Sequence, residues 1–250
     1  MANLPLFLFT LLGGMAAGTY LAETCLERKH GDANPWLVPA VALALVAVGA
    51  VAATFHVGNI ARAFTLHVNL GAGMTQEVLL AAVFGVLVLV DLVLCAAKKQ
   101  SPFALRVCGA VAAVLLMLSM GHAYTTVLGN PVWAQPVATI LSFFAGSLLS
   151  GLLLFSLLRC RAMDSNAAKA YLSVASVLLV VGLAVQASVF ATYSANVALL
   201  VAGLVASIAG TACAFAAPKR TGAALPAAAF ALALVGVGMA RWAFYAASVL

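Results

Sequence analysis

Three side chains that could move protons or bind an anion lie close together in one polar segment of an otherwise apolar chain: His56, Arg62 and Glu77. Ionisable residues are costly in a lipid bilayer and are rare there without a functional reason. An imidazole and a carboxylate that converge on a hydroquinone could accept its two protons as it is oxidised. His56 and Glu77 are therefore candidate catalytic residues for such a reaction.

Each member of this pair also has a structural explanation. His56 would end a helix, where the helix dipole favours a polar or cationic side chain. Together with His122, expected at a similar depth, it could instead ligate a haem. Glu77 would lie in the first turn of a helix capped by Thr75, where the dipole stabilises a carboxylate. The short, glycine-containing connection between His56 and Glu77 favours a shared functional role.

Arg62, Arg241 and Tyr245 are further candidates for binding the same ligand. Arg62 lies in a segment, residues 60–68, that we expect to form a short interfacial helix. It could contact an anionic lipid, a quinone oxygen or the acidic face of a docked protein. Arg241 lies four residues before Tyr245 and hence on the same helical face. Snorkelling of Arg241 toward the membrane interface would also explain its position.

The segments that carry these residues are almost continuously apolar. Hydrophobic residues make up 66% of the 250-residue chain and charged residues 7%, against about 25% charged residues in soluble domains. About 20 apolar residues suffice to cross the hydrocarbon core of a bilayer. We therefore predict an all-α integral membrane protein forming one domain over residues 1–250. Its eight transmembrane helices would cover about residues 4–25, 36–56, 76–97, 102–124, 136–158, 169–191, 196–217 and 224–248.

Basic residues are distributed unevenly between the two ends of these predicted helices. Of the twelve Lys and Arg residues, only Arg62 and Arg241 fall on the side of the termini. The positive-inside rule then predicts that both termini lie outside. The first apolar segment follows no basic region, so we expect a retained helix and not a signal peptide. The basic residues are scattered singly, which argues against a nucleic-acid partner.

Small residues are concentrated in the first and fifth predicted spans. The first contains Gly13, Gly14 and Gly18, and the fifth contains Gly146 and Gly151. Small residues allow membrane helices to approach closely. We expect close contacts from these two helices and, because each opens a group of four, two four-helix bundles.

Helix-end and interface residues lead to further expectations. Ser101 is predicted to cap the helix that follows Pro102, and Ser165 is among the residues that could cap the next inner-side start. An aromatic belt is predicted to contain Tyr124, Tyr193, Trp242 and Tyr245 at the outer boundary and Trp36 and Tyr171 at the inner one, and Trp133 is also expected at headgroup depth. Asp91, near Lys98 and Lys99, is expected to reach the inner interface. It could alternatively belong to a proton route toward Glu77, about 21 Å away along the helix.

Cysteine and histidine spacing argues against a metal centre built by this chain. The five cysteines include no Cys-x-x-Cys pair, which predicts neither an iron–sulfur cluster nor a zinc site. Only one pair of histidines is expected at matching depth, so we also predict no haem. We therefore name no metal-binding residue.

Three parts of the chain resemble the membrane anchor subunits of dimethyl sulfoxide reductases and related molybdenum oxidoreductases, within the wider group of polysulfide and nitrite reductase anchors. They are residues 4–10; His56-Val57-Gly58 with Arg62-Ala63-Phe64 and Met74-Thr75-Gln76-Glu77-Val78; and Gly238 with Arg241 and Phe244-Tyr245. The resemblance covers the whole chain. It implies that His56 and Glu77 correspond to the family's quinol-site His and Glu.

The resemblance implies a subunit of the cytoplasmic membrane of a prokaryote that oxidises menaquinol to menaquinone. Its partners would be membrane lipid, a ferredoxin-like iron–sulfur subunit with four clusters and a molybdopterin catalytic subunit. Two other functions stay open at this point, a purely structural or assembly anchor and a small-molecule transporter. A transporter should carry polar residues near the bilayer midplane, whereas those of this chain are expected mainly at the outer rim.

Overall fold

The computed structural model describes residues 4–26, 34–57, 71–98, 101–127, 129–159, 165–193, 195–216 and 224–247. It confirms the predicted all-α architecture, because these residues form eight helices that are each long and apolar enough to cross a membrane. Their ends differ from the predicted ones by three residues at most. The helices are α1 (Leu4–Cys25), α2 (Leu37–Val57), α4 (Gly73–Lys98), α5 (Phe103–Thr125), α6 (Pro136–Arg159), α7 (Asn166–Thr192), α8 (Ala198–Ala216) and α9 (Ala224–Ala246).

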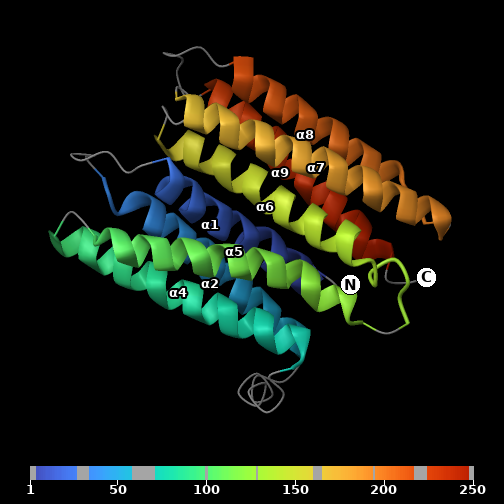
Figure 1. Ribbon diagram of the computed structural model, residues 1–250, viewed down its shortest axis with the longest axis horizontal. Helices are drawn as coiled ribbons and strands as arrows, with labels where there is room; N and C mark the ends of the chain where they lie inside the picture. Colours follow the sequence, from blue (N-terminus) through green and yellow to red (C-terminus); the bar gives the residue numbers. More distant parts are fainter. Residues whose placement is uncertain are drawn as a thin grey trace.

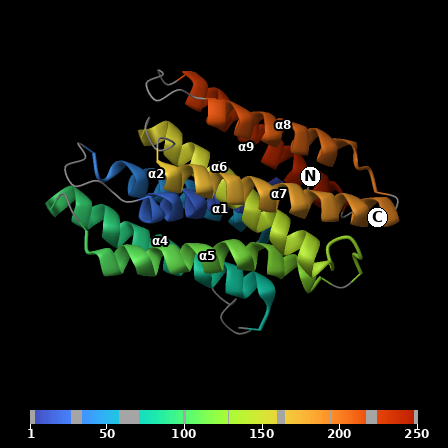
Figure 2. The same cartoon turned by 45° about the horizontal axis from the view of Figure 1, so that its top comes forward.

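The helices lie roughly side by side, with α1 and α6 at the centre of the molecule (Figures 1 and 2). On one flank α1, α2, α4 and α5 contact one another in a ring, and on the other flank α6, α7, α8 and α9 do the same. Contacts of α6 with α1 and α5 join the two groups. The first and last described residues lie at the same end of the molecule, where Asn130 Nδ2 donates to the carbonyl of Ala247 at 3.3 Å.

Glycines bring the two central helices into backbone contact, as their small residues predicted. A Cβ placed on Gly151 of α6 would overlap the backbone of Gly18 and Thr19 in α1. A Cβ placed on Gly18 would in turn overlap the carbonyl group of Ser147. Such an approach maximises van der Waals contact, which is what holds membrane helices together in lipid.

Both the buried and the outward faces of the helices are apolar, as a membrane requires. On α4 the residues Ala81, Phe84 and Val88 are buried against neighbouring helices, whereas Val83 and Val86 on the other face are exposed. An exposed valine face would be unfavourable in water, but in a bilayer it contacts lipid chains of the same polarity.

Of the two predicted helix caps, one is confirmed and the other is wrong. Ser165 caps α7, its hydroxyl accepting from the amide of Ala168 at 3.1 Å. The predicted cap at Ser101 is wrong, because Pro102 itself occupies the N-cap position of α5 and Ser101 lies one residue too early.

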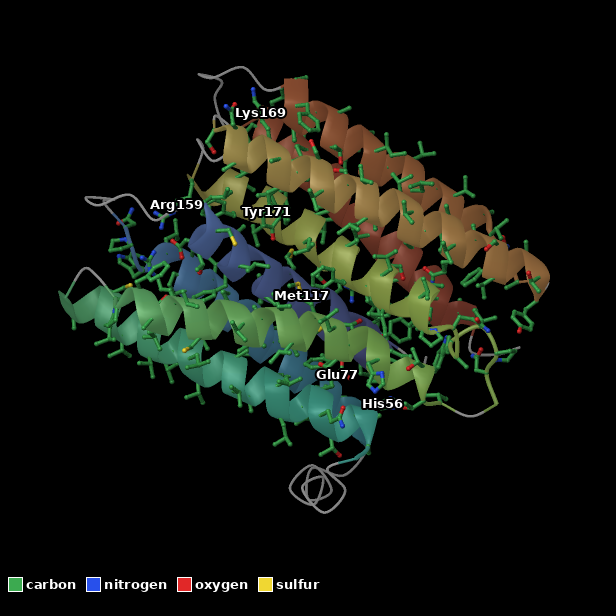
Figure 3. The ribbon with its side chains drawn as sticks, in the orientation of Figure 1. His56, Glu77, Met117, Arg159, Lys169 and Tyr171 are labelled. Atoms are coloured by element: carbon green, nitrogen blue, oxygen red, sulfur yellow. The ribbon has the colours of Figure 1, made fainter. Side chains whose placement is uncertain are left out.

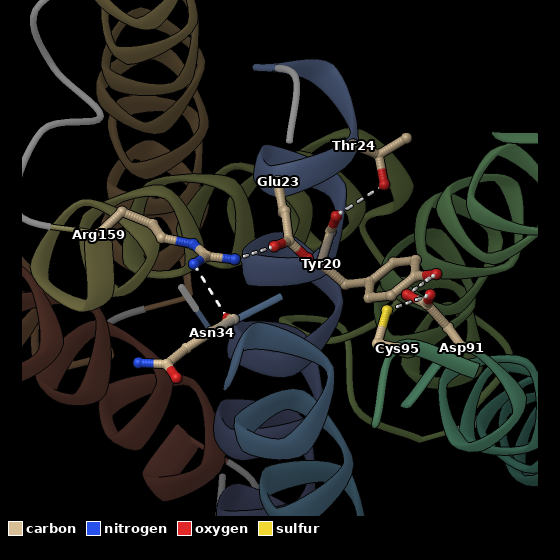
Figure 4. A network of polar contacts seen from close by, with 7 residues as sticks. All are labelled: Tyr20, Glu23, Thr24, Asn34, Asp91, Cys95 and Arg159. Atoms are coloured by element: carbon tan, nitrogen blue, oxygen red, sulfur yellow. Dashed lines mark hydrogen bonds and ion pairs between the residues drawn. The ribbon is translucent and has the colours of Figure 1, made fainter. Parts of the chain in front are cut away.

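Toward the end of the bundle opposite the chain termini lie two buried acidic residues, Glu23 of α1 and Asp91 of α4, whose contacts are drawn in Figure 4. Glu23 forms an ion pair with Arg159 of α6 at 2.6 Å, and Arg159 also donates to the carbonyl of Asn34. Asp91 of α4 is 0% exposed. Its carboxylate accepts from the hydroxyl of Tyr20 at 2.9 Å and from the thiol of Cys95 at 3.3 Å.

The expectation that Asp91 reaches the inner interface is therefore wrong. Asp91 lies on the same face of α4 as Ala81, Phe84 and Val88, and that face packs against other helices. Asp91 was expected to find its hydrogen-bond partners at the membrane interface. Instead, the hydroxyl of Tyr20 donates to it inside the protein.

Candidate functional site

His56 and Glu77 lie at the same end of two helices that pack against each other. His56 is half-buried in the last turn of α2, and Glu77 lies near the start of α4. Figure 3 shows both at this end, whereas Arg159 and Lys169 lie at the opposite end of the bundle. Arg62 and the interfacial helix expected over residues 60–68 lie outside the described residues.

Glu77 is not in the first turn of its helix. The helix begins at Gly73, so Thr75 is already inside it and cannot be its N-cap; the explanation by capping and helix dipole is wrong. Glu77 is 3% exposed, and among the described residues its Oε1 atom has no hydrogen-bond partner. An unpaired polar atom at such depth is unusual in a folded protein and calls for an explanation.

The start of α4 is held tightly against the end of α5. A Cβ on Gly73 would lie 2.8 Å from the Cα atom of Ala123, so only a glycine permits this approach. Glu77 follows one turn later, and Tyr124 follows Ala123 directly. Glu77 consequently lies within electrostatic range of Tyr124, Tyr245 and Arg241.

Arg241 of α9 is buried between the two halves of the molecule, with 4% of its surface exposed. It donates to the carbonyl of Thr10 at 2.7 Å, to the carbonyl of Phe143 at 3.0 Å and to the hydroxyl of Ser147 at 2.7 Å. Its guanidinium also lies over the Phe143 ring, 4.5 Å from the centroid. Snorkelling of Arg241 to the interface is therefore wrong, because helices α1 and α6 supply its acceptors inside the protein.

A chain of hydroxyl groups lies beside this arginine. Tyr245 donates to the hydroxyl of Tyr124 at 2.7 Å and lies 3.0 Å from the hydroxyl of Thr10. The indole of Trp133 donates to the carbonyl of Phe244 at 2.8 Å. These interactions join α1, α5 and α9 with the segment that precedes α6.

The prediction that Tyr124, Trp133 and Tyr245 lie at the outer membrane boundary is therefore wrong. Tyr124, Trp133 and Tyr245 are buried in a cluster of aromatic rings, with a centroid separation of 5.3 Å between Tyr124 and Trp133. Trp242 and Tyr193 are exposed, as belt residues should be. The three buried rings have polar atoms whose partners lie within the protein, so they do not depend on lipid headgroups.

Arg241 and Tyr245 form a buried polar centre with the residues to which they are hydrogen-bonded, Thr10, Tyr124 and Ser147. The last three are not among the site residues predicted from the sequence. Their one signal is the run of small residues beside them. A Cβ on Gly14 would lie 3.2 Å from Arg241 Nη2 and would overlap the Ser147 hydroxyl. The glycine run in α1 thus makes room for the guanidinium as well as for α6.

His122, the second histidine considered as a haem ligand, lies on an exposed part of α5 near its end. Its ring lies 3.4 Å from the hydroxyl of Thr125. Within the described ranges, no three His, Cys, Asp or Glu side chains are grouped so as to hold a metal ion.

The model of one protein family, described as DMSO reductase anchor subunit (DmsC), matches residues 1–246. The match covers nearly the whole chain and includes every residue of the polar centre. No curated protein and no solved structure matches the chain.

Proposed function

Because the chain belongs to the family of DMSO reductase anchor subunits, we propose that it oxidises menaquinol in the cytoplasmic membrane of a prokaryote. Family membership identifies a multi-pass membrane anchor that associates with catalytic and iron–sulfur subunits. The proposal adds that His56 and Glu77 form the quinol site, and that the electrons pass to the iron–sulfur subunit on the outer face.

The observation that carries the proposal is the Oε1 atom of the buried Glu77, which has no hydrogen-bond partner within the described part of the chain. A buried carboxylate oxygen without a donor is unfavourable unless a ligand supplies one. A quinol hydroxyl is such a donor. His56, at the same end of the adjacent helix, supplies a second proton acceptor.

These residues can account for both protons of the reaction. Oxidation of menaquinol to menaquinone releases two protons and two electrons. Glu77 accepts one proton and His56 the other, while both electrons leave to the iron–sulfur subunit. The hydroxyl of Tyr124 accepts from Tyr245, which leaves the hydrogen of Tyr124 available to donate to a bound ligand.

Quinol-dependent reduction of the iron–sulfur clusters in the purified complex tests this proposal. We expect Glu77→Gln and His56→Ala to leave the complex assembled but to slow cluster reduction by at least about 100-fold, the usual contribution of a general base. His122→Ala is the matched control, since it removes an exposed histidine at the same end of the bundle.

Full quinol oxidation by either variant would refute the site. A purely structural anchor is distinguished by the same assay, because the clusters of the unmodified complex would then fail to be reduced by menaquinol at all.

A further inference from the structure

A small cavity lies between α6, α7 and α9, beside Arg241. Three polar residues from the three helices line it: Ser142, Gln186 and Arg241. The remaining walls are apolar side chains. The cavity has room for about one water molecule.

Two hydrogen-bond donors at this cavity have no partner among the residues that the structure describes. They are Nε2 of Gln186 and Nε of Arg241, and both atoms are buried. Gln186 is 2% exposed, so neither lipid headgroups nor bulk water can satisfy its amide. Two unpaired donors lining one cavity call for a shared acceptor.

We propose that this cavity is a binding site for a single water molecule, bound by Arg241, Gln186 and Ser142. The water oxygen accepts from Arg241 Nε and from Gln186 Nε2. The hydroxyl of Ser142 donates to the carbonyl of Thr139 at 3.2 Å, which leaves its lone pairs to accept a hydrogen from the water. Three polar partners is the usual number for a buried water.

The chemistry of the lining selects water over other small ligands. A halide ion could accept from both nitrogens but has no hydrogen for Ser142. An apolar molecule or an empty cavity would leave both donors unpaired, at the cost of their full desolvation. The inference uses only these groups and does not depend on the proposed function.

The water gives α7 a polar connection to the centre of the molecule. Helix α7 packs on α6 but is not among the helices in extensive contact with α9. Through the water, Gln186 of α7 is joined to Arg241 and so to the acceptors of Arg241 on α1 and α6. Gln186 is thus a positioning residue for the guanidinium, although it lies on a peripheral helix.

X-ray radiolytic labelling of the purified complex in ¹⁸O-water tests the site, because bound water generates hydroxyl radicals that oxidise adjacent side chains. We expect incorporation of ¹⁸O at the cavity residue Leu183 in the unmodified protein. Gln186→Leu should lower this incorporation several-fold, because it removes one donor and fills part of the cavity. Ser207→Ala is the matched control: Ser207 is also buried with an unpaired side-chain oxygen, but it lies on α8, outside this cavity. This variant should leave labelling at Leu183 unchanged.

Absence of labelling at Leu183 in the unmodified protein, or equal labelling in Gln186→Leu, would overturn the proposal. If Gln186→Leu does not assemble, a high-resolution map of the unmodified complex decides. Density for one water within hydrogen-bond distance of both nitrogens supports the site, whereas an empty or halide-filled cavity refutes it.

Discussion

At the scale of single residues, Arg241 raises the question of why a cation is buried among neutral groups. Its acceptors are two helix carbonyls and one hydroxyl. No carboxylate of the described chain lies within ion-pair distance of it, and Glu77 is the nearby acid that its charge affects. Burying a charge in this way is unfavourable, so stability alone does not explain Arg241.

We therefore expect Arg241→Met to destabilise the protein less than Arg241→Lys does. Arg241→Met removes the charge along with its hydrogen bonds, and we expect unfolding free energy to change by no more than about 1 kcal/mol. Arg241→Lys keeps the charge, but an ammonium cannot reach all three acceptors at once, so we expect a loss of about 2 kcal/mol. Unfolding of the complex in detergent measures both values. A lysine variant more stable than the methionine variant would contradict this reasoning.

At the scale of helices, the contact between α1 and α6 depends on glycine. We expect Gly151→Val to prevent stable assembly, because its Cβ would overlap the backbone of Gly18 and Thr19, which no side-chain rotation relieves. Gly85→Val is the control, because nothing lies within 4 Å of a Cβ at that position. Size-exclusion chromatography of the two variants in detergent makes the comparison. If the Gly151→Val variant assembles and elutes as a single monodisperse peak, α1 and α6 are not in backbone contact at this position.

The ion pair between α1 and α6 is a second test at this scale. Arg159→Met leaves the buried Glu23 carboxylate without this guanidinium, and we expect a loss of about 3 kcal/mol. Adding Glu23→Gln to the same chain should restore most of that loss, because the carboxylate charge that the ion pair with Arg159 offset is then removed as well. Thermal unfolding of the single and double variants checks the prediction, and equal stability of the two would argue against it.

At the scale of the whole molecule, the position of the proposed site bears on energy conservation. Between Asp91 and Glu77 the buried face of α4 carries only Ala81, Phe84 and Val88, a distance of about 21 Å. The ring of Phe84 packs edge-on against Tyr20, with centroids 5.8 Å apart. This face offers no polar route for protons between the two acidic residues.

We therefore expect electroneutral turnover, with protons and electrons both leaving toward the face on which the site lies. Reconstitution of the complex in sealed vesicles with a potential-sensitive dye measures this during quinol oxidation. A sustained potential that an uncoupler abolishes would show that protons enter from the opposite side. Asp91→Asn would then be the first variant to examine, since Asp91 is the buried acidic residue on the same face of α4 as Glu77.

Composition and spacing were sufficient to predict the eight helices, their approximate ends and that α1 and α6 make close helix contacts, although not that they make them with each other. Each of these features depends on the local sequence alone. A helix must contain enough apolar residues to cross the bilayer, and a glycine permits close helix contact at whatever position it occupies. The location of His56 and Glu77 at one end of neighbouring helices followed from the same reasoning, because consecutive membrane helices run in opposite directions.

Only the tertiary structure decided which side of each helix faces the protein interior and which side faces lipid. In a soluble helix the polar and apolar faces identify the buried side, but here both faces are apolar, so the sequence carried no such signal. For that reason Asp91, Arg241, Tyr124 and Tyr245 were expected at the membrane interface and instead lie inside. Neighbouring helices supply their hydrogen-bond partners there, and this pairing could not be read from any one segment.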